Sequence, residues 1–272
     1  MSSGWIVQGR VIMALILREV HTLYGSSRLG YLWAVIQTMF GIGIFWGIRE
    51  IAGARAPHGM SVLMFLLAGF GLWATFSETL TKCMTAVNGN KALLTFPQVT
   101  PLDLMLSRTV VVWGTQLSSG CVIAGIAAFC GTSLYVSDWT GLFAAFLLTP
   151  LLGLGCGMLC ASLAVFWPTL EKIVPMILRI LFFASGIFFP FDVSKDIADI
   201  LLLNPVMQLI ELLRQSLSRG YVAPTYDYLY IVAFCVVSCA LAGCWSGMRA
   251  RGRAMIALHN IAKSYPVPRG KN

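Results

Sequence analysis

The side chains that could do chemistry in this chain are too scattered to share a site. The sequence holds eight cysteines and three histidines, yet no CxxC pair occurs, and no histidine accompanies the i,i+4 pairs Cys156/Cys160 and Cys235/Cys239. A cysteine inside an apolar run behaves as a small apolar residue, so we predict neither a disulfide nor a metal site. The histidines fall in separate predicted loops, at His21, His58 and His259.

Acidic and phosphate-binding patterns are equally weak. Asp192, Asp196 and Asp199 come closest to a carboxylate cluster, but their spacing fits the polar face of a short helix better than an enzyme site. A membrane-embedded transferase is therefore disfavoured. Gly89-Asn90-Lys91 lacks the preceding glycine and the following hydroxyl residue of a GxxxxGK[ST] loop. We predict no catalytic, cofactor or metal site in this chain, and no ATP bound by it.

The elements that must position these residues are long apolar helices. Hydrophobic residues make up 58% of the 272 positions and charged residues only 11%, against about 25% charged in an ordinary soluble domain. The apolar runs are roughly 17 to 28 residues long, which is the length of a membrane-spanning helix, whereas barrel strands would alternate over about ten positions. The sequence predicts an all-α polytopic membrane protein.

Six transmembrane helices fit the runs, with both termini in the cytosol. A seventh apolar run, residues 11–17 within the N-terminal segment 1–29, is too short to span and predicts an interfacial helix. With this topology most of the +8 net charge, including the tail 249–272, lies inside, as the positive-inside rule requires; nucleic-acid binding is disfavoured for the same reason. The predicted spans cover about 30–48, 60–86, 109–130, 139–166, 173–189 and 228–248.

Two patterns within the spans predict helix contacts. Gly153, Gly155 and Gly157 form a GxGxG with no preceding strand, so close helix packing is favoured over a dinucleotide site. Glu78 and Lys82 are four positions apart and could pair on one helix face, or they could be solvated anchors at the inner edge of the membrane.

Residues 192–227, before the last predicted span, hold only short apolar runs, broken by acids and by Asn204-Pro205. After the proline, one helical face is apolar and the other polar. Either a re-entrant helical hairpin or a plain amphipathic extracellular loop would fit. The apolar face holds Val206, Leu209, Ile210, Leu213 and Leu217, and the polar face holds Gln208, Glu211, Gln215 and Ser218.

The largest polar interruption, residues 88–108, lies in the cytosol by the same charge argument. Few ionisable residues fall deep in the spans; Arg179 is the clearest, and Glu78 is borderline. An ion-coupled secondary transporter would need several such charges and inverted repeats. An external energy source that acts on this polar loop is therefore favoured.

Several short motifs, in order along the chain, resemble those of ABC-2 type permeases that export polysaccharides. The resemblance is greatest to the capsular polysaccharide export permeases of Gram-negative bacteria, with O-antigen and teichoic-acid permeases as relatives. The motifs are Leu17-Arg18-Glu19, Tyr24-Gly25, Leu29-Gly30-Tyr31-Leu32-Trp33-Ala34, Phe96-Pro97, Pro101-Leu102-Asp103 and Asn204-Pro205.

The resemblance implies a homodimer in the bacterial inner membrane, bound to two cytosolic ATPase subunits that bind the ATP. It implies periplasmic adaptor and outer-membrane partners, and an anionic polymer on a lipid anchor as substrate. It also implies re-entrant helices over about 192–215 and a coupling helix in the first cytosolic loop, 87–108. The coupling residues would be Val87, Asn88, Gly89, Asn90, Lys91, Ala92, Leu93 and Leu94.

Basic residues at the dimer seam would attract an acidic polymer. Arg28, Arg179 and Arg214 are candidates for the inner side, the membrane and the outer side. Arg28 and Arg214 fit ordinary interface anchors equally well. The aromatic residues that follow Arg179 could stack on sugar rings, or pack against lipid; they are Phe182, Phe183, Phe188, Phe189 and Phe191.

Overall fold

The computed structural model describes residues 4–24, 30–51, 53, 60–90, 93–94, 96, 98–129, 131, 135–188, 203–218, 220–221, 227–241 and 243. Over these residues it contains helices and no strand, so the all-α prediction is confirmed. The helices are α1 (Gly4–Tyr24), α2 (Gly30–Ile51), α3 (Val62–Met84), α4 (Ala86–Gly89), α5 (Pro101–Phe129), α6 (Trp139–Ala164), α7 (Leu170–Ala184), α9 (Pro205–Ser216) and the unlabelled helix Tyr228–Leu241.

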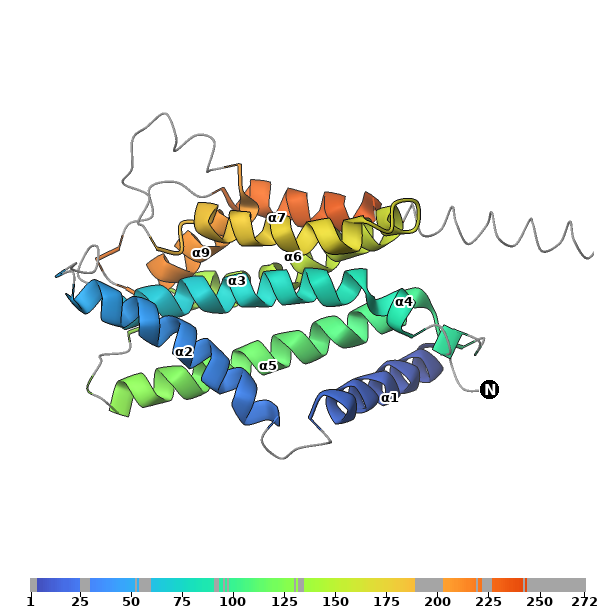
Figure 1. The fold of residues 1–272 in the computed structure, drawn as a ribbon, viewed down its shortest axis with the longest axis horizontal. Coiled ribbons are helices and arrows are strands. Elements are labelled where there is room, and N and C mark those ends of the chain that lie inside the picture. The colour runs from blue at the N-terminus through green and yellow to red at the C-terminus, as the bar shows by residue number, and fades with distance from the viewer. Residues whose placement is uncertain are drawn as a thin grey trace, which may run out of the picture.

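The long helices lie side by side in one bundle, with α3 at its centre (Figure 1). α3 packs against α2, α5, α6, α7 and α9. Its buried side chains Leu72, Phe76 and Leu80 share one apolar cluster with Leu152 of α6 and Leu178 of α7. Because lipid tails are as apolar as these side chains, close packing rather than the hydrophobic effect holds such helices together in a bilayer.

Among the described helices, α3, α5 and α6 are long and apolar enough to cross a membrane. They have 23, 29 and 26 residues, or about 35 to 44 Å at 1.5 Å per residue, which exceeds the roughly 30 Å hydrocarbon core. α7 has 15 residues, and the helix Tyr228–Leu241 is also shorter than a typical span. The six-span topology therefore stays a prediction.

Two helices are longer than their predicted apolar runs. α1 has 21 residues where the run 11–17 was expected. α5 begins at Pro101, before the predicted span, because Thr100 and Asp103 form a capping box: the Asp103 carboxylate accepts from the Thr100 N–H at 2.8 Å, and the Thr100 hydroxyl accepts from the Asp103 N–H at 3.3 Å. α4 and α5 thus occupy both ends of the predicted loop 87–108.

α6 begins at a second side-chain cap. The carboxylate of Asp138 accepts from the N–H groups of Thr140 at 2.9 Å and Gly141 at 3.0 Å. The hydrogen bond from the Thr140 hydroxyl, followed by these backbone bonds, lowers the pKa of Asp138. The cap is therefore fully formed above the pKa of an unfolded aspartate, and it is lost as the pH falls through the lowered value.

The GxGxG motif lies at close helix contacts on two sides of α6. A Cβ at Gly153 would lie 2.9 Å from Thr79 Cβ, and one at Gly157 would lie 2.7 Å from Cys83 Cβ, so both glycines face α3. Gly155 faces the other way, where a Cβ would lie 3.1 Å from the backbone nitrogen of Cys239. The prediction of close helix packing is confirmed on both sides of α6.

We expect Gly157→Ala to destabilise the protein by about 1 to 3 kcal/mol, because the added methyl group would overlap a neighbouring helix. The obstructing atoms include the Leu80 carbonyl oxygen at 2.9 Å, which cannot withdraw as a flexible side chain could. Thermal unfolding in detergent, followed by tryptophan fluorescence, should show a Tm several degrees lower. Gly120→Ala on α5 is the matched control, since a Cβ there meets no atom within 4 Å; an equal drop in both variants would contradict the packing argument.

α9 differs most from its predicted form, a helix with one apolar and one polar face. All of its residues from Val206 to Arg214 are buried, on the polar face as well as the apolar one. α9 packs on α3 and α6, and its polar side chains find partners inside the protein. The alternative prediction of an amphipathic loop on the surface is therefore wrong for α9. Residues 189–202 lie outside the described residues, so the re-entrant hairpin stays a prediction.

Candidate functional site

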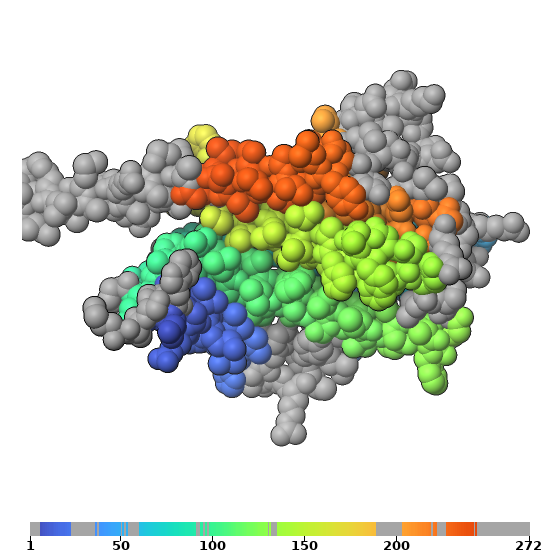
Figure 2. All heavy atoms as spheres, turned by 180° about the vertical axis from the view of Figure 1, so that it is seen from behind, coloured from blue at the N-terminus to red at the C-terminus, as the bar shows by residue number. Residues whose placement is uncertain are grey.

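Polar contacts between helices gather at the end of the bundle where α1, α4 and the first turns of α5 and α7 meet (Figure 1). Seen from behind, α1 lies against this end beside the start of α5 (Figure 2). The predicted coupling residues that the structure describes belong to this end. Since lipid offers no polar partners, such a concentration of hydrogen bonds favours a position at a membrane surface.

The predicted coupling segment is only partly helical. α4 ends at Gly89, Leu93 and Leu94 form a short turn, and Lys91 and Ala92 lie outside the described residues. Val87, Leu93 and Leu94 pack against a buried apolar cluster below them. The exposed side chain of Asn88 donates to Glu171 at the start of α7. The coupling segment is thus held on the bundle by apolar packing and by a hydrogen bond to α7.

α1 fixes this segment through a set of charged and amide side chains that we call the α1 clamp: Gln8, Arg18 and Glu19 of α1 with Asn90, Asp103 and Arg108. Arg18 donates to the side-chain oxygen of Asn90, and Asn90 donates in turn to the Ala86 carbonyl at 3.0 Å. Gln8 donates to the buried carboxylate of Asp103. The clamp therefore contacts both ends of the predicted loop.

Arg108 is the centre of the clamp. Its Nε lies 3.2 Å from the Glu19 carboxylate, an ion pair whose angle falls short of a hydrogen bond. Its Nη1 donates to the Lys82 carbonyl at 2.8 Å and to the Thr85 hydroxyl at 3.4 Å. Arg108 of α5 thus contacts both the last turn of α3 and Glu19, near the C-terminal end of α1. The sequence analysis placed Glu19 in a short motif and Arg108 at the end of the polar interruption 88–108, and it did not predict that they pair.

The three arginines proposed for the polymer path have different surroundings. Arg28 lies outside the described residues. Arg179 is exposed on α7. Arg214 is fully buried, and its Nη1 lies 2.8 Å from the Glu211 carboxylate. Nη1 also donates to the Gly186 carbonyl, and Nη2 donates to the Ile187 carbonyl, each at 2.9 Å. In this conformation no polymer could reach Arg214, so a role in the path stays a prediction that would require a rearrangement.

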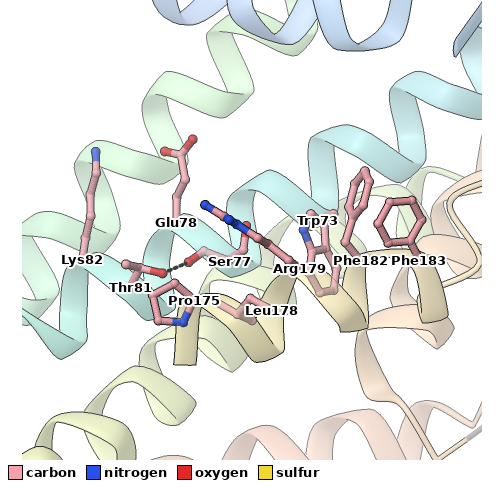
Figure 3. A pocket seen from close by; sticks show the side chains of 10 residues that line it. All are labelled: Trp73, Ser77, Glu78, Thr81, Lys82, Pro175, Leu178, Arg179, Phe182 and Phe183. Atoms are coloured by element: carbon pink, nitrogen blue, oxygen red, sulfur yellow. Dashed lines mark hydrogen bonds between the residues drawn. The ribbon is translucent and has the colours of Figure 1, made fainter. Parts of the chain in front are cut away.

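Arg179 lines a groove of about 460 Å³ between α3 and α7 (Figure 3). Its guanidinium extends across the groove towards the side chains of α3. Glu78 and Lys82 also line the groove, but they do not pair with each other as their spacing would allow; Glu78 accepts instead from Gln116 of α5 at 3.0 Å. The α3–α7 groove is lined by Trp73, Ser77, Glu78, Thr81 and Lys82 of α3 and by Pro175, Leu178, Arg179, Phe182 and Phe183 of α7.

Within the described part of the chain, no three histidine, cysteine, aspartate or glutamate side chains are placed to hold a metal ion. The six cysteines described there, Cys83, Cys121, Cys156, Cys160, Cys235 and Cys239, are free thiols. The candidate functional regions of the described chain are therefore the polar end of the bundle, the buried Arg214–Glu211 pair and the α3–α7 groove.

Comparisons with known proteins agree with this arrangement. The model of the ABC-2 type transporter family matches residues 10–218. The polysialic acid transport protein KpsM of Escherichia coli is 28% identical, over 87% of this chain and 92% of its own length. The capsule polysaccharide export inner-membrane protein CtrC of Neisseria meningitidis serogroup B is 23% identical, over 84% and 86%. The O-antigen export system permease protein RfbA of Klebsiella pneumoniae is 22% identical, over 82% and 85%.

The family match covers the groove, α9 and every clamp residue except Gln8, and it extends over most of the chain. With three apolar helices long enough to span a bilayer, the protein is a multi-pass membrane protein. The resemblance drawn from the short motifs is confirmed: the chain belongs to the ABC-2 type transporter family.

Proposed function

We propose that this chain is the permease subunit of an ATP-binding-cassette exporter that moves a lipid-linked, anionic capsular polysaccharide across the bacterial inner membrane. The observation that carries the proposal is the family match over residues 10–218, together with relatives named for capsule polysaccharide export. ATP would be bound and hydrolysed by a separate subunit. The chain itself would act as a transport subunit and not as an enzyme.

The working assembly would be two copies of this chain with two cytosolic ATPase subunits. Each copy would have six spans, both termini in the cytosol, and a re-entrant hairpin over 192–227 before the last span. Periplasmic adaptor and outer-membrane export proteins would receive the polymer. The nearly complete burial of α9 supports a segment that folds back into the protein, because irregular backbone at membrane depth must be covered by protein or line a cavity.

The coupling step would begin at residues 87–94. ATP binding would close the ATPase subunits and push on this segment. Arg108 would pass the displacement to α3 and α5, since it joins the Lys82 carbonyl to its own helix. Asn88 would pass it to α7 through Glu171. The helices would then move together and open a path between the two subunits.

We expect the double variant Asn90→Asp with Lys91→Glu to lose export and to retain less ATPase subunit on co-purification. The variant would place two negative charges in the segment that we assign to ATPase contact. The carboxylate at position 90 could still accept from Arg18, but it could not donate to the Ala86 carbonyl as Asn90 does. Surface polymer, measured with a capsule-binding reagent in a deletion strain, would fall at least tenfold. Lys172→Glu, an exposed change at the same end of the bundle, should have little effect.

Normal export and normal ATPase recovery in the double variant would refute the coupling assignment. A wild-type chain that restores no surface polymer would refute the proposed function itself. Export of a lipid-linked O-antigen or teichoic acid is the alternative, and likeness to RfbA supports the O-antigen. Chemical analysis of the exported polymer separates these substrates. An ion-coupled transporter is less favoured, since α6 carries no charged residue.

A further inference from the structure

Two cations line the α3–α7 groove without a partner. Among the residues that the structure describes, neither Lys82 nor Arg179 forms a side-chain hydrogen bond or an ion pair, although both line the groove with Glu78. A charged side chain within a transmembrane segment is costly, so it commonly has a partner or marks a substrate pathway. An unpaired arginine on α7, with an unpaired lysine in the last turn of α3 lining the same groove, therefore points to a ligand that carries negative charge.

Hydrogen-bond acceptors lie beside these cations. Glu78 uses one carboxylate oxygen to accept from Gln116 at 3.0 Å, so the other oxygen is available to a ligand hydroxyl. Thr81 donates to the Ser77 carbonyl at 2.7 Å, and its hydroxyl oxygen keeps lone pairs for further donors. The groove thus offers cations that can bind a carboxylate and acceptors that can bind hydroxyl groups. An acidic sugar carries both of these groups.

An aromatic wall completes the groove. Phe182 is held in place by Phe70, Trp73 and Phe188, with ring centroids 5.3 to 5.9 Å away. Phe183 packs edge-on against Phe182 at 5.2 Å, and it remains 66% exposed. An aromatic face with its negative quadrupole suits the C–H face of a sugar ring. Phe182, together with Phe188, whose ring stacks on Phe183 at 5.8 Å between centroids, would orient the exposed side of the Phe183 ring.

We propose that the α3–α7 groove is a binding subsite for an acidic sugar unit of the exported polymer. Arg179 and Lys82 bind the carboxylate, Glu78 and Thr81 accept from the hydroxyls, and Phe183 stacks on the ring. The volume of about 460 Å³ lies within the roughly 300 to 1,000 Å³ of small-molecule sites. A lipid tail would fit the apolar floor of Pro175 and Leu178 but would leave both cations unpaired. This assignment rests on the proposed function.

The test uses the full chain with its ATPase subunit in nanodiscs, and trigalacturonate and maltotriose as probes of equal ring number. Calorimetry should show that trigalacturonate binds at least tenfold more tightly than maltotriose, and more weakly as salt is added. Arg179→Gln should weaken trigalacturonate binding about tenfold, Arg179→Lys less, and Phe183→Ala about fivefold for both probes. Phe143→Ala on α6, where the ring is 65% exposed, is the matched control and should bind as wild type does.

Equal affinity for the two probes, no measurable trigalacturonate binding at millimolar concentration, or unchanged binding by Arg179→Gln would overturn the subsite. Each variant is also measured for surface polymer and for thermal unfolding, which separates lost binding from misfolding. If the wild type exports polymer and Arg179→Gln and Phe183→Ala export it equally well, the subsite is refuted and the proposed function stands. If the wild type exports no polymer, the proposed function fails.

Discussion

Replacing Arg214 by methionine is expected to destabilise the protein by about 3 to 5 kcal/mol, because breaking a buried ion pair leaves its partner as an uncompensated charge. Arg214 is fully buried, and Glu211 beside it is almost so. The same change removes both hydrogen bonds to the carbonyls of Gly186 and Ile187. It also removes a guanidinium whose central carbon lies 3.5 Å from the centroid of the Phe65 ring.

The double variant Arg214→Met with Glu211→Leu separates the cost of the unpaired buried charge from the cost of the lost hydrogen bonds. Without Glu211 no charge of this pair is left buried, and replacing both partners by apolar groups is often nearly neutral. The carbonyls of Gly186 and Ile187 would still lose their donor, at about 1 to 3 kcal/mol each, and the Tyr221 hydroxyl would lose Glu211 as an acceptor. We therefore expect only partial recovery of the Tm.

Thermal unfolding in detergent compares the wild type, both variants and Arg214→Lys. The lysine keeps the charge but cannot reproduce the planar fork, so an intermediate Tm is expected. A Tm within one degree of wild type for Arg214→Met would show that this arginine does not hold the residues after α7 to α9. That result would make its proposed position on the polymer path more attractive.

Reversing either charge of the Glu19–Arg108 pair is expected to reduce polymer export at least tenfold with little loss of the folded protein. In Glu19→Arg two arginines would face each other, and in Arg108→Glu two carboxylates would, so α1 would separate from the polar end of the bundle. The swapped variant, Glu19→Arg with Arg108→Glu, restores opposite charges. Contacting residues in one network commonly show coupling energies of about 0.5 to 3 kcal/mol.

Rescue by the swap should be incomplete, because a glutamate at position 108 cannot donate to the Lys82 carbonyl as Arg108 does. Export in cells, ATP hydrolysis by the purified complex and Tm are measured for each variant. Arg10→Glu, a reversal at an exposed position of α1, is the control and should export normally. If the swapped variant loses as much export as the two single variants combined, the ion pair does not transmit the movement of the ATPase.

The sequence alone determined the fold class, the family and most helix positions, because these depend on local properties. An apolar run long enough to span a bilayer predicts a helix wherever it occurs, and α2, α3 and α6 begin and end within three residues of the predicted spans. The GxGxG motif predicted close packing, since glycine is the residue that allows it. Short motifs read in order were enough to identify the ABC-2 type transporter family.

Only the tertiary structure decided how the polar residues are used, because their partners are distant in the sequence. The polar face of α9 resembled a solvated surface, yet Arg214 finds the carbonyls of Gly186 and Ile187 inside the protein. Glu19 and Arg108 pair across two helices. Glu78 accepts from Gln116 instead of pairing with Lys82 one turn away. Helical periodicity shows which side chains share a face, but it cannot show which other helix that face meets.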